Sequence, residues 1–200
     1  MTESSPVSRK VVLTLFVSLD GVVENPAWTA PYRADDSTAF KHAELFESDV
    51  LLLGRVTYQG FAAYWPSAQG TGDFGERMNS LPKLVVATTL RQPAWNAEFI
   101  GGDVVEAVQQ LKAQPGQNIL IYGSRTLAQT LMAHGLIDEY RFLVYPLVLG
   151  KGQKLFPDGA APLTLKLTSA QTFSSGVVAL IYSSQPSALL LISANSSPNM

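Results

Sequence analysis

The sequence predicts one α/β domain whose central sheet is parallel over most of its width and antiparallel at one edge. Apolar runs with strand character alternate with amphipathic helical runs from Val11 to Ala133. This pattern is typical of parallel strands joined by helices that cover both faces of a sheet. The end of the chain is rich in strands instead, and a short Ser-Ser-Gly turn between its last two runs indicates an antiparallel hairpin. A length of 200 residues suits one domain with a substantial core.

The expected elements follow from these patterns in chain order. Strands are predicted over residues 11–17, 50–53, 84–88, 99–100, 119–122, 140–148, 163–173 and 177–183. Helices are predicted over residues 35–47, 56–64, 74–81, 104–112 and 124–133. Asp36 and Ser37 are expected to cap the first helix, and Asp103 the fourth. We therefore expect a flexible segment over residues 1–9, a domain over residues 10–184 and a tail over residues 185–200.

The composition excludes several classes of chemistry. The chain has no cysteine, so it has no disulfide, thiolate metal site or cysteine nucleophile. His42 and His134 are far apart and form no HxH or HExxH pattern, which disfavours a metal centre. A formal net charge of −2 provides no basic field for nucleic acid or anionic lipid. Neither a signal peptide nor a membrane span is predicted, and we expect a cytoplasmic protein.

Two strand–glycine–helix junctions are the most informative local feature. In each, a buried strand meets a glycine and a helix begins at once, which presents unpaired N–H groups to an anion. The junction residues are Gly54, Arg55 and Thr57 after the second strand, and Gly123, Ser124, Arg125 and Thr126 after the fifth. Neither junction has a GxGxxG or GxxxxGK[ST] motif, and glycine after a strand can also be ordinary turn chemistry. Two such junctions together fit the pyrophosphate of a dinucleotide.

Five motifs in a fixed order make the chain recognisable. They are Ser18-Leu-Asp-Gly21, Leu53-Gly-Arg-Val-Thr57, Tyr122-Gly-Ser124, Ile137-Asp-Glu-Tyr140, and Pro146 to Gly152 followed by Leu155-Phe156. From Lys10 to Ser183 the chain resembles the dihydrofolate-reductase-like superfamily. Within it, the chain is most similar to the reductase domain of bifunctional riboflavin-biosynthesis deaminase-reductases. The resemblance implies a three-layer fold, with a mostly parallel mixed central sheet, helices on both faces and an antiparallel C-terminal hairpin.

The resemblance also implies a cofactor, NADPH, and positions that hold it. Gly54, Arg55 and Thr57 correspond to the first cofactor segment, with Arg55 near the adenosine 2′-phosphate. Thr88, Thr89 and Arg91 follow the third strand and are implied to reach the same phosphate. The second pyrophosphate segment corresponds to Gly123, Ser124, Arg125 and Thr126. The implied activity is NADPH-dependent reduction of a pterin-, pyrimidine- or flavin-precursor-like heterocycle, with phosphoribosylaminouracil reductase of riboflavin biosynthesis as the particular case.

The substrate side follows from the same resemblance. Residues 20–28 resemble the loop that closes over the nicotinamide in dihydrofolate reductases, which places Asn25 and Trp28 near the substrate. Asp36 stands four residues before Phe40, as does the catalytic carboxylate of those enzymes. Asp36 is therefore the predicted proton source, although it is equally a candidate helix cap, and Asp20 is the alternative. Lys151, between two glycines, is a candidate for an anionic group of the substrate, or part of a plain strand-end turn.

The sequence also departs from the riboflavin-pathway pattern. The stretch from His42 to Ser48 has no arginine where those reductases carry a basic motif, and no zinc-binding cysteines of a deaminase are present. Two alternatives therefore stay open, namely a catalytically silent nucleotide-binding module and a dihydrofolate reductase proper. We expect a small heterocyclic ligand, no nucleic-acid or membrane partner, and a homodimer like those of riboflavin-type relatives.

Overall fold

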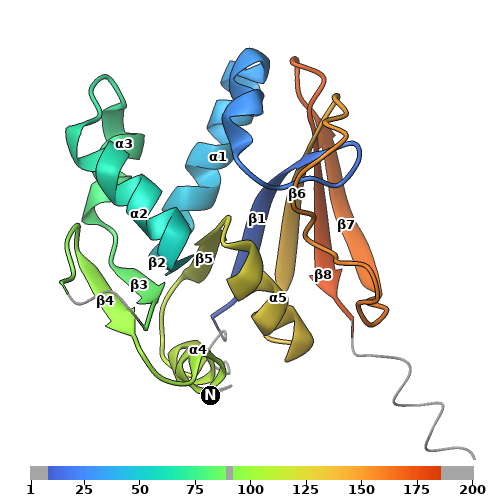
Figure 1. Ribbon diagram of the computed structural model, residues 1–200. Coiled ribbons are helices and arrows are strands. Elements are labelled where there is room, and N and C mark those ends of the chain that lie inside the picture. The colour runs from blue at the N-terminus through green and yellow to red at the C-terminus, as the bar shows by residue number, and fades with distance from the viewer. Residues whose placement is uncertain (1–8, 89–91, 186–200) are drawn as a thin grey trace, which may run out of the picture.

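The computed structural model describes residues 9–88 and 92–185, and within them the chain forms a three-layer α/β fold (Figure 1). The strands are β1 (Val11–Ser18), β2 (Ser48–Gly54), β3 (Lys83–Val86), β4 (Ala97–Ile100), β5 (Asn118–Tyr122), β6 (Glu139–Tyr145), β7 (Leu165–Thr172) and β8 (Val178–Ser184). The helices are α1 (Asp35–Phe46), α2 (Arg55–Tyr64), α3 (Gly72–Ser80), α4 (Val104–Lys112) and α5 (Arg125–Ala133), with short 3-10 helices at Pro26–Tyr32 and Trp65–Ser67.

One sheet holds all of these strands, in the order β4-β3-β2-β5-β1-β6-β8-β7. The pairs from β4 to β6 are parallel, whereas β8 is antiparallel to both β6 and β7. The predicted α/β class, with its mostly parallel sheet and antiparallel C-terminal hairpin, is thus confirmed. Because β1, β2 and β5 run in the same direction, their carboxyl ends meet at one edge of the sheet.

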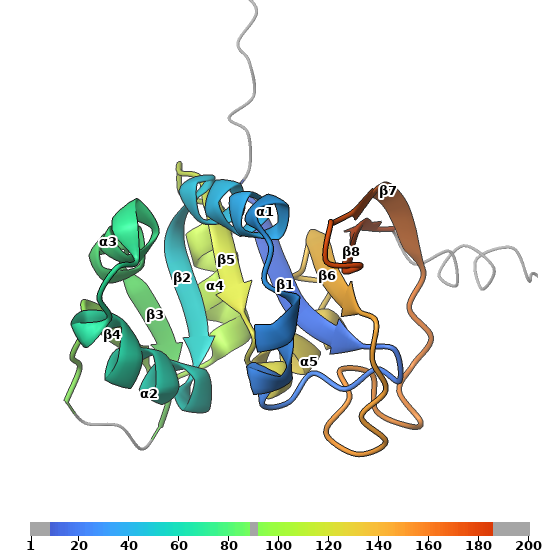
Figure 2. The same ribbon diagram turned by 90° about the horizontal axis from the view of Figure 1, so that it is seen from above.

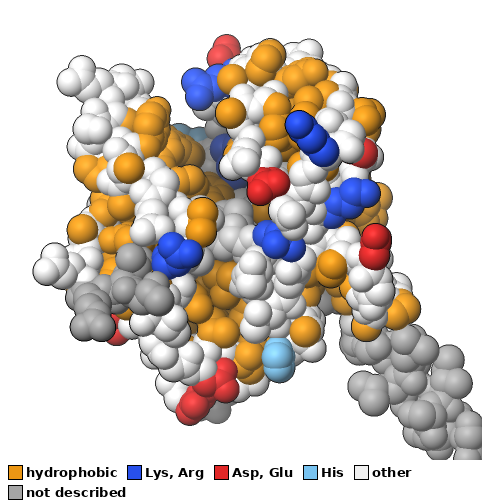
Figure 3. Space-filling model, in the orientation of Figure 1, with side chains coloured by type: hydrophobic (Ala, Val, Ile, Leu, Met, Phe, Trp, Pro, Cys, Tyr) orange, Lys and Arg blue, Asp and Glu red, His pale blue; other side chains and the backbone are white. Residues whose placement is uncertain are grey.

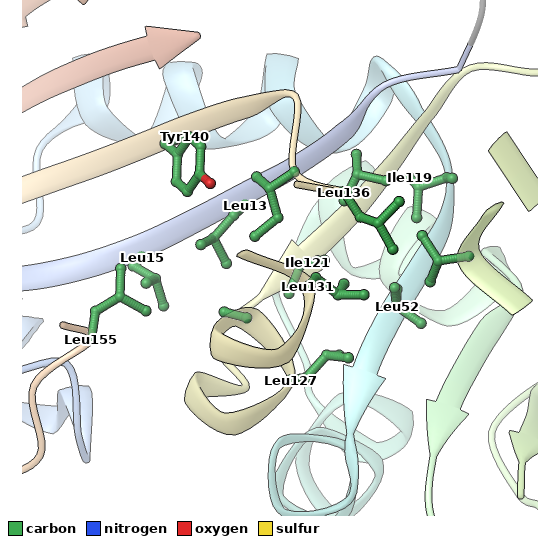
Figure 4. Close-up of a cluster of buried hydrophobic side chains, with 14 of the residues drawn as sticks. Leu13, Leu15, Leu52, Ile119, Ile121, Leu127, Leu131, Leu136, Tyr140 and Leu155 are labelled. Carbon is green, nitrogen blue, oxygen red and sulfur yellow. The ribbon is translucent and has the colours of Figure 1, made fainter. Parts of the chain in front are cut away.

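The helices cover the two faces of the sheet unequally. On one face, α1, α2 and α3 contribute Leu45, Tyr58 and Met78 to a buried cluster. On the other face, α4 and α5 pack against β1, β2 and β5, where Leu127 and Leu131 of α5 meet the strand side chains (Figures 2 and 4). The strands between the helix layers are therefore apolar on both faces, which explains their continuous hydrophobic runs.

A third cluster lies at the antiparallel end, under the segment that connects β1 to α1. Trp28 packs edge-to-face on Tyr145 with ring centroids 5.3 Å apart, and Phe40 packs on Phe173 at 5.6 Å. Leu143, Val177 and Ala179 complete the buried part of this cluster. The 3-10 helix Pro26–Tyr32, which replaces the loop expected there, is held in place by these aromatic contacts.

The main local differences concern helix ends. The N-cap residue of α1 is Ala34, not Asp36 or Ser37, so the predicted cap is wrong. The Ser37 hydroxyl instead donates to the Ala34 carbonyl at 2.9 Å, and Asp36 lies in the first turn. Asp103 does cap α4, as expected, and accepts hydrogen bonds from the Val105 and Glu106 N–H groups. Helix α3 begins at Gly72, within a glycine-rich stretch, and is longer than the one or two turns expected.

The described part of the chain has neither a membrane-spanning helix nor a metal-binding cluster of side chains. None of its helices is both long enough and apolar enough to span a membrane. Across residues 9–88 and 92–185, there is also no group of three or more His, Cys, Asp or Glu side chains placed to hold a metal ion.

Candidate cofactor and substrate cleft

A cleft of about 1090 Å³ opens at the carboxyl ends of β2, β5 and β1. Figure 3 shows the molecule hollowed between the side that carries α2 and α3 and the side that carries the β1–α1 connection. The volume is just above the roughly 300–1,000 Å³ typical of small-molecule sites. In a mostly parallel sheet, this edge is where ligands bind.

The first junction brings the start of α2 to the cleft. Gly54 precedes the helix in an extended conformation, and its N–H donates to the Ser124 Oγ at 2.7 Å. A Cβ on Gly54 would come within 3.3 Å of both Cβ and Oγ of Ser124. Glycine is therefore favoured here, because a larger residue would press against the second junction.

The second junction brings the start of α5 to the same place. Gly123 and Ser124 both have left-handed backbones, with φ of 63° and 60°, which turns the chain sharply from β5 into α5. The Ser124 hydroxyl donates to the Thr57 Oγ1 at 3.0 Å while it accepts from Gly54. Since the Thr57 Oγ1 accepts this hydrogen bond, the O–H of Thr57 remains free to donate to a ligand. One serine hydroxyl thus holds two helix N-termini side by side.

The charge of the cleft is positive. Its described lining includes Lys41, Arg55 and Arg125 but only one acidic side chain, Glu24. Arg55 and Arg125 are the first residues of α2 and α5, so their charges add to those of the helix N-termini. Together these groups can bind an anion with two phosphates.

The predicted site residues separate into two groups. Those that line the cleft are Asn25, Gly54, Arg55, Thr57, Gly123, Ser124, Arg125 and Thr126. The other described residues do not line it: Trp28 and Phe40 belong to the third aromatic cluster, while Thr88 and Lys151 are exposed outside the cleft. Thr89 and Arg91 lie outside the described residues. The placement of Trp28 and Phe40 follows from their rings packing on Tyr145 and Phe173.

The two carboxylates considered as proton sources also lie outside the cleft lining. Asp36 Oδ2 accepts the Ser174 N–H at 2.7 Å, which ties the start of α1 to the β7–β8 turn and lowers the pKa of Asp36. Asp20 accepts from the Ser18 hydroxyl at 2.7 Å and from the Leu149 and Gly150 N–H groups at 3.1 and 2.8 Å. The Gly150 N–H, next to Lys151 in the chain, is thus used by Asp20.

Asp20 gives a pH-dependent prediction for the stability of this loop contact. The Ser18 hydroxyl and the loop N–H groups lower its pKa from 3.8 to about 2. A depressed pKa contributes stability above about pH 4, and that contribution is lost as the pH falls towards 2. Asp20→Asn should therefore have a lower Tm than the wild type at neutral pH, and the difference should shrink in this acid range. A Tm difference that stays constant down to pH 2 would contradict this role.

Sequence reasoning missed a buried polar group at the floor of the cleft. Lys41 of α1 forms an ion pair with Glu44, whose side chain is fully buried. The Lys41 Nζ also lies 3.3 Å from the Thr14 Oγ1 and 4.0 Å from the centroid of the Tyr122 ring. Arg141 of β6 approaches Glu44 from the other side at 3.7 Å. The Lys-x-x-Glu spacing was a usable signal, but at (i, i+3) it is also typical of an exposed helix face.

Comparison with known proteins agrees with this geometry. Residues 9–179 match the family model described as the RibD C-terminal domain. The chain is 32% identical over 177 residues to the uncharacterized protein YyaP of Bacillus subtilis (strain 168), covering 87% of this chain and 94% of that protein.

Two solved structures share the fold. One is described as a riboflavin biosynthesis protein from Shewanella sp. PV-4, with a TM-score of 0.72, 19% identity, and coverage of 88% of this chain and 99% of that one. The other is the dihydrofolate reductase from Enterococcus faecalis complexed with NADP(H), with a TM-score of 0.61, 12% identity, and coverage of 88% and 97%. At such identities the likeness concerns the fold alone.

The fold and the cleft define a dihydrofolate-reductase-like domain. Because the family model spans most of its length, the chain belongs to the RibD C-terminal domain family, a family of reductase domains.

Proposed function

We propose that this protein is an NADPH-dependent reductase that transfers a hydride to a planar heterocycle of the pterin, pyrimidine or flavin-precursor type. The observation that carries the proposal is the pair of helix N-termini held together by Ser124 at the cleft. Membership of the RibD C-terminal domain family supports a reductase. A neighbour of the same fold, the Enterococcus dihydrofolate reductase, is complexed with NADP(H).

The residues of the cleft fit the proposed cofactor. Gly123 has a left-handed backbone, which glycine adopts without the strain that a Cβ brings. A Cβ at this position would lie 3.5 Å from the Thr57 Oγ1. The N-terminal N–H groups of α2 and α5, with the Thr57 hydroxyl, would hold the pyrophosphate, and Arg55 would hold the 2′-phosphate. When bound, NADPH supplies the hydride, and the protein positions the two rings and provides a proton.

The other half of the cleft suits the faces of a planar ring. Five aromatic side chains line it on the side of α1, α2 and α3: Phe16, Phe61, Trp65, Phe74 and Tyr122. Such walls bind a planar ring by stacking and by edge-to-face contact, and they exclude water from the reacting atoms. We therefore place the substrate there and the adenosine half of the cofactor over the two junctions.

A catalytically silent nucleotide-binding module is the second candidate, and one observation favours it. Neither predicted catalytic carboxylate, Asp36 or Asp20, lines the cleft. NADPH oxidation dependent on a heterocycle separates the two candidates, because a silent module would bind the cofactor without turnover.

The cofactor assignment is tested by comparing Arg55→Ala with Arg125→Ala. If Arg55 contacts the 2′-phosphate, its loss should weaken NADPH binding about tenfold and leave NADH binding nearly unchanged. Arg125→Ala, at the second pyrophosphate segment, should weaken the binding of NADPH and of NADH by similar factors. Calorimetric titration of each variant with NADPH and with NADH measures both effects. Equal losses for the two cofactors in Arg55→Ala would contradict the assignment, and no binding of NADPH to the wild type would reject the proposed function.

A further inference from the structure

In the described lining of the cleft, the aromatic half contains a cation, Lys41, that belongs to neither of the two junctions. Arg55 and Arg125 stand at the helix N-termini, whereas Lys41 approaches from α1, between Phe16 and Tyr122. Its side chain is only 16% exposed, and its Nζ lies 5.5 Å from the centroid of the Phe16 ring. An ammonium group is rarely buried against aromatic rings in this way unless it is paired.

The hydrogen bonds of Lys41 are incomplete. An ammonium has three N–H donors. Within residues 9–88 and 92–185, its acceptors are Glu44 and the Thr14 hydroxyl. One donor is therefore left for a group that enters the cleft.

Glu44, the ion-pair partner of Lys41, also lies close to a second cation, Arg141. The Glu44 side chain is fully buried, and its Oε2 has no hydrogen-bond partner within the described residues, although Arg141 is 3.7 Å away. Arg141 in turn pairs with Glu139 at 2.6 Å and with Glu47 at 3.2 Å. Buried ion pairs of this kind often cost as much in desolvation as they gain in attraction, so they are weak evidence for a purely stabilising role.

The groups around Lys41 also suit proton transfer. Burial lowers the pKa of Lys41, and the Glu44 carboxylate opposes that shift, so the ammonium holds its proton less tightly than that of a free lysine. Burial, with the charge of Glu44, raises the pKa of Tyr122 well above its ordinary value, which makes that phenol a poor acid. Glu24, the acidic residue of the described lining, lies on the exposed loop and accepts the Gln153 N–H at 3.2 Å.

We propose that Lys41 is the catalytic acid of this cleft and that the substrate presents a ring carbonyl oxygen or ring nitrogen to its free N–H. This inference rests on the proposed reductase function. The hydride of NADPH forms a new C–H bond as the C=N or C=O π bond breaks, and the π electrons move to the nitrogen or oxygen. That atom takes a proton from the Lys41 ammonium, which is then reprotonated from solvent. The sum is NADPH, a proton and the heterocycle giving NADP⁺ and the dihydro product.

The same geometry defines the substrate class. An ammonium donates but cannot accept, so an N–H directed at Lys41 would be left unpaired in a buried site and would be rejected. The preferred ligand is a flat ring with an acceptor on the edge that is inserted towards α1. An anionic form of that edge, such as an enolate, would bind more tightly still.

The test compares Lys41→Met with Lys166→Met, a matched loss of an exposed lysine on β7. Three heterocycles serve as probes with NADPH, namely phosphoribosylaminouracil, dihydrofolate and flavin mononucleotide. Lys41→Met should lower kcat for the reduced probe by at least about 100-fold, the usual contribution of an acid, and leave the Kd of NADPH unchanged. The double variant Lys41→Met/Glu44→Gln, which removes the buried unpaired carboxylate, gives the same comparison if the single variant does not fold.

The pH profile adds a readout that a structural role would not move. The wild-type rate should fall at high pH as Lys41 loses its proton. This fall should occur at a pH below the ordinary pKa of a lysine. Glu44, Tyr122 and Arg141 are the ionisable groups that face this ammonium or its carboxylate partner. The residual rate of Lys41→Met should not show this fall at high pH. A variant with the wild-type kcat would overturn the inference and leave the proposed function standing. Wild-type binding of NADPH without reduction of any probe would overturn the substrate class, and absence of NADPH binding would reject the proposed function itself.

Discussion

Replacement of Gly123 by valine should abolish NADPH binding while the protein remains folded. Gly123 has φ of +63° and faces Thr57 across the two junctions, so the added methyl groups would occupy the proposed pyrophosphate site. The variant should bind neither NADPH nor NADH, because both cofactors contain the pyrophosphate. Calorimetric titration measures the loss, and circular dichroism reports the fold.

Gly135→Val is the matched control for that variant. Gly135 has the same φ of +63°, but nothing lies within 4 Å of a Cβ there, and it does not line the cleft. The strain of placing valine in the left-handed region, on the order of 1–3 kcal/mol, should be similar at both sites. Normal NADPH binding by a folded Gly123→Val protein would show that the second junction has only a structural role.

Glu44→Gln should cause the largest loss of stability among the charged positions of α1. The substitution keeps the shape of the side chain but leaves Lys41 and Arg141 without the buried carboxylate between them. Breaking a buried pair in this way costs about 3–5 kcal/mol, far more than loss of a surface pair. Urea unfolding measures the change.

Glu47→Gln provides the comparison, because Glu47 also pairs with Arg141 but its side chain is 55% exposed. Its effect should be below about 1 kcal/mol. Equal and small losses in the two variants would contradict the view that Glu44 is the centre of the buried charge cluster.

The fold could be predicted because strand burial is recorded directly in the sequence. In β2, Val50 and Leu52 face one core cluster while Leu51 and Leu53 face the other, so a run of apolar residues marks a strand covered on both faces. The cofactor junctions were also visible, since glycine, a hydroxyl and a helix start are close together in the chain. That Ser124 joins the two junctions was not visible, because its partners are about seventy residues away.

The substrate side was harder to predict for the same physical reason. Asp36 and Phe40 had the expected spacing, but their partners, Ser174 and Phe173, come from the C-terminal hairpin. Lys41 is adjacent to Phe40 in sequence, yet its burial depends on contacts from Thr14 of β1 and Tyr122 of β5. Spacing along one helix cannot show which of its faces a distant strand will cover.

The most direct test of the proposed reductase is transfer of deuterium from NADPH to a heterocycle. NADPH labelled on the reactive carbon of its nicotinamide ring is incubated with the wild-type protein and each of the three probes, and the products are analysed by mass spectrometry. We expect one deuterium on carbon in the product, on a ring carbon with dihydrofolate and on the sugar carbon of the C=N group with phosphoribosylaminouracil. The flavin accepts the hydride on N5, where deuterium exchanges with water, so its reduction is followed by the loss of its visible absorbance. Gly123→Val should give none of these signals. Stoichiometric binding of NADPH by the wild type with no deuterium in either product and no bleaching of the flavin would contradict the proposed hydride transfer and favour the silent nucleotide-binding module.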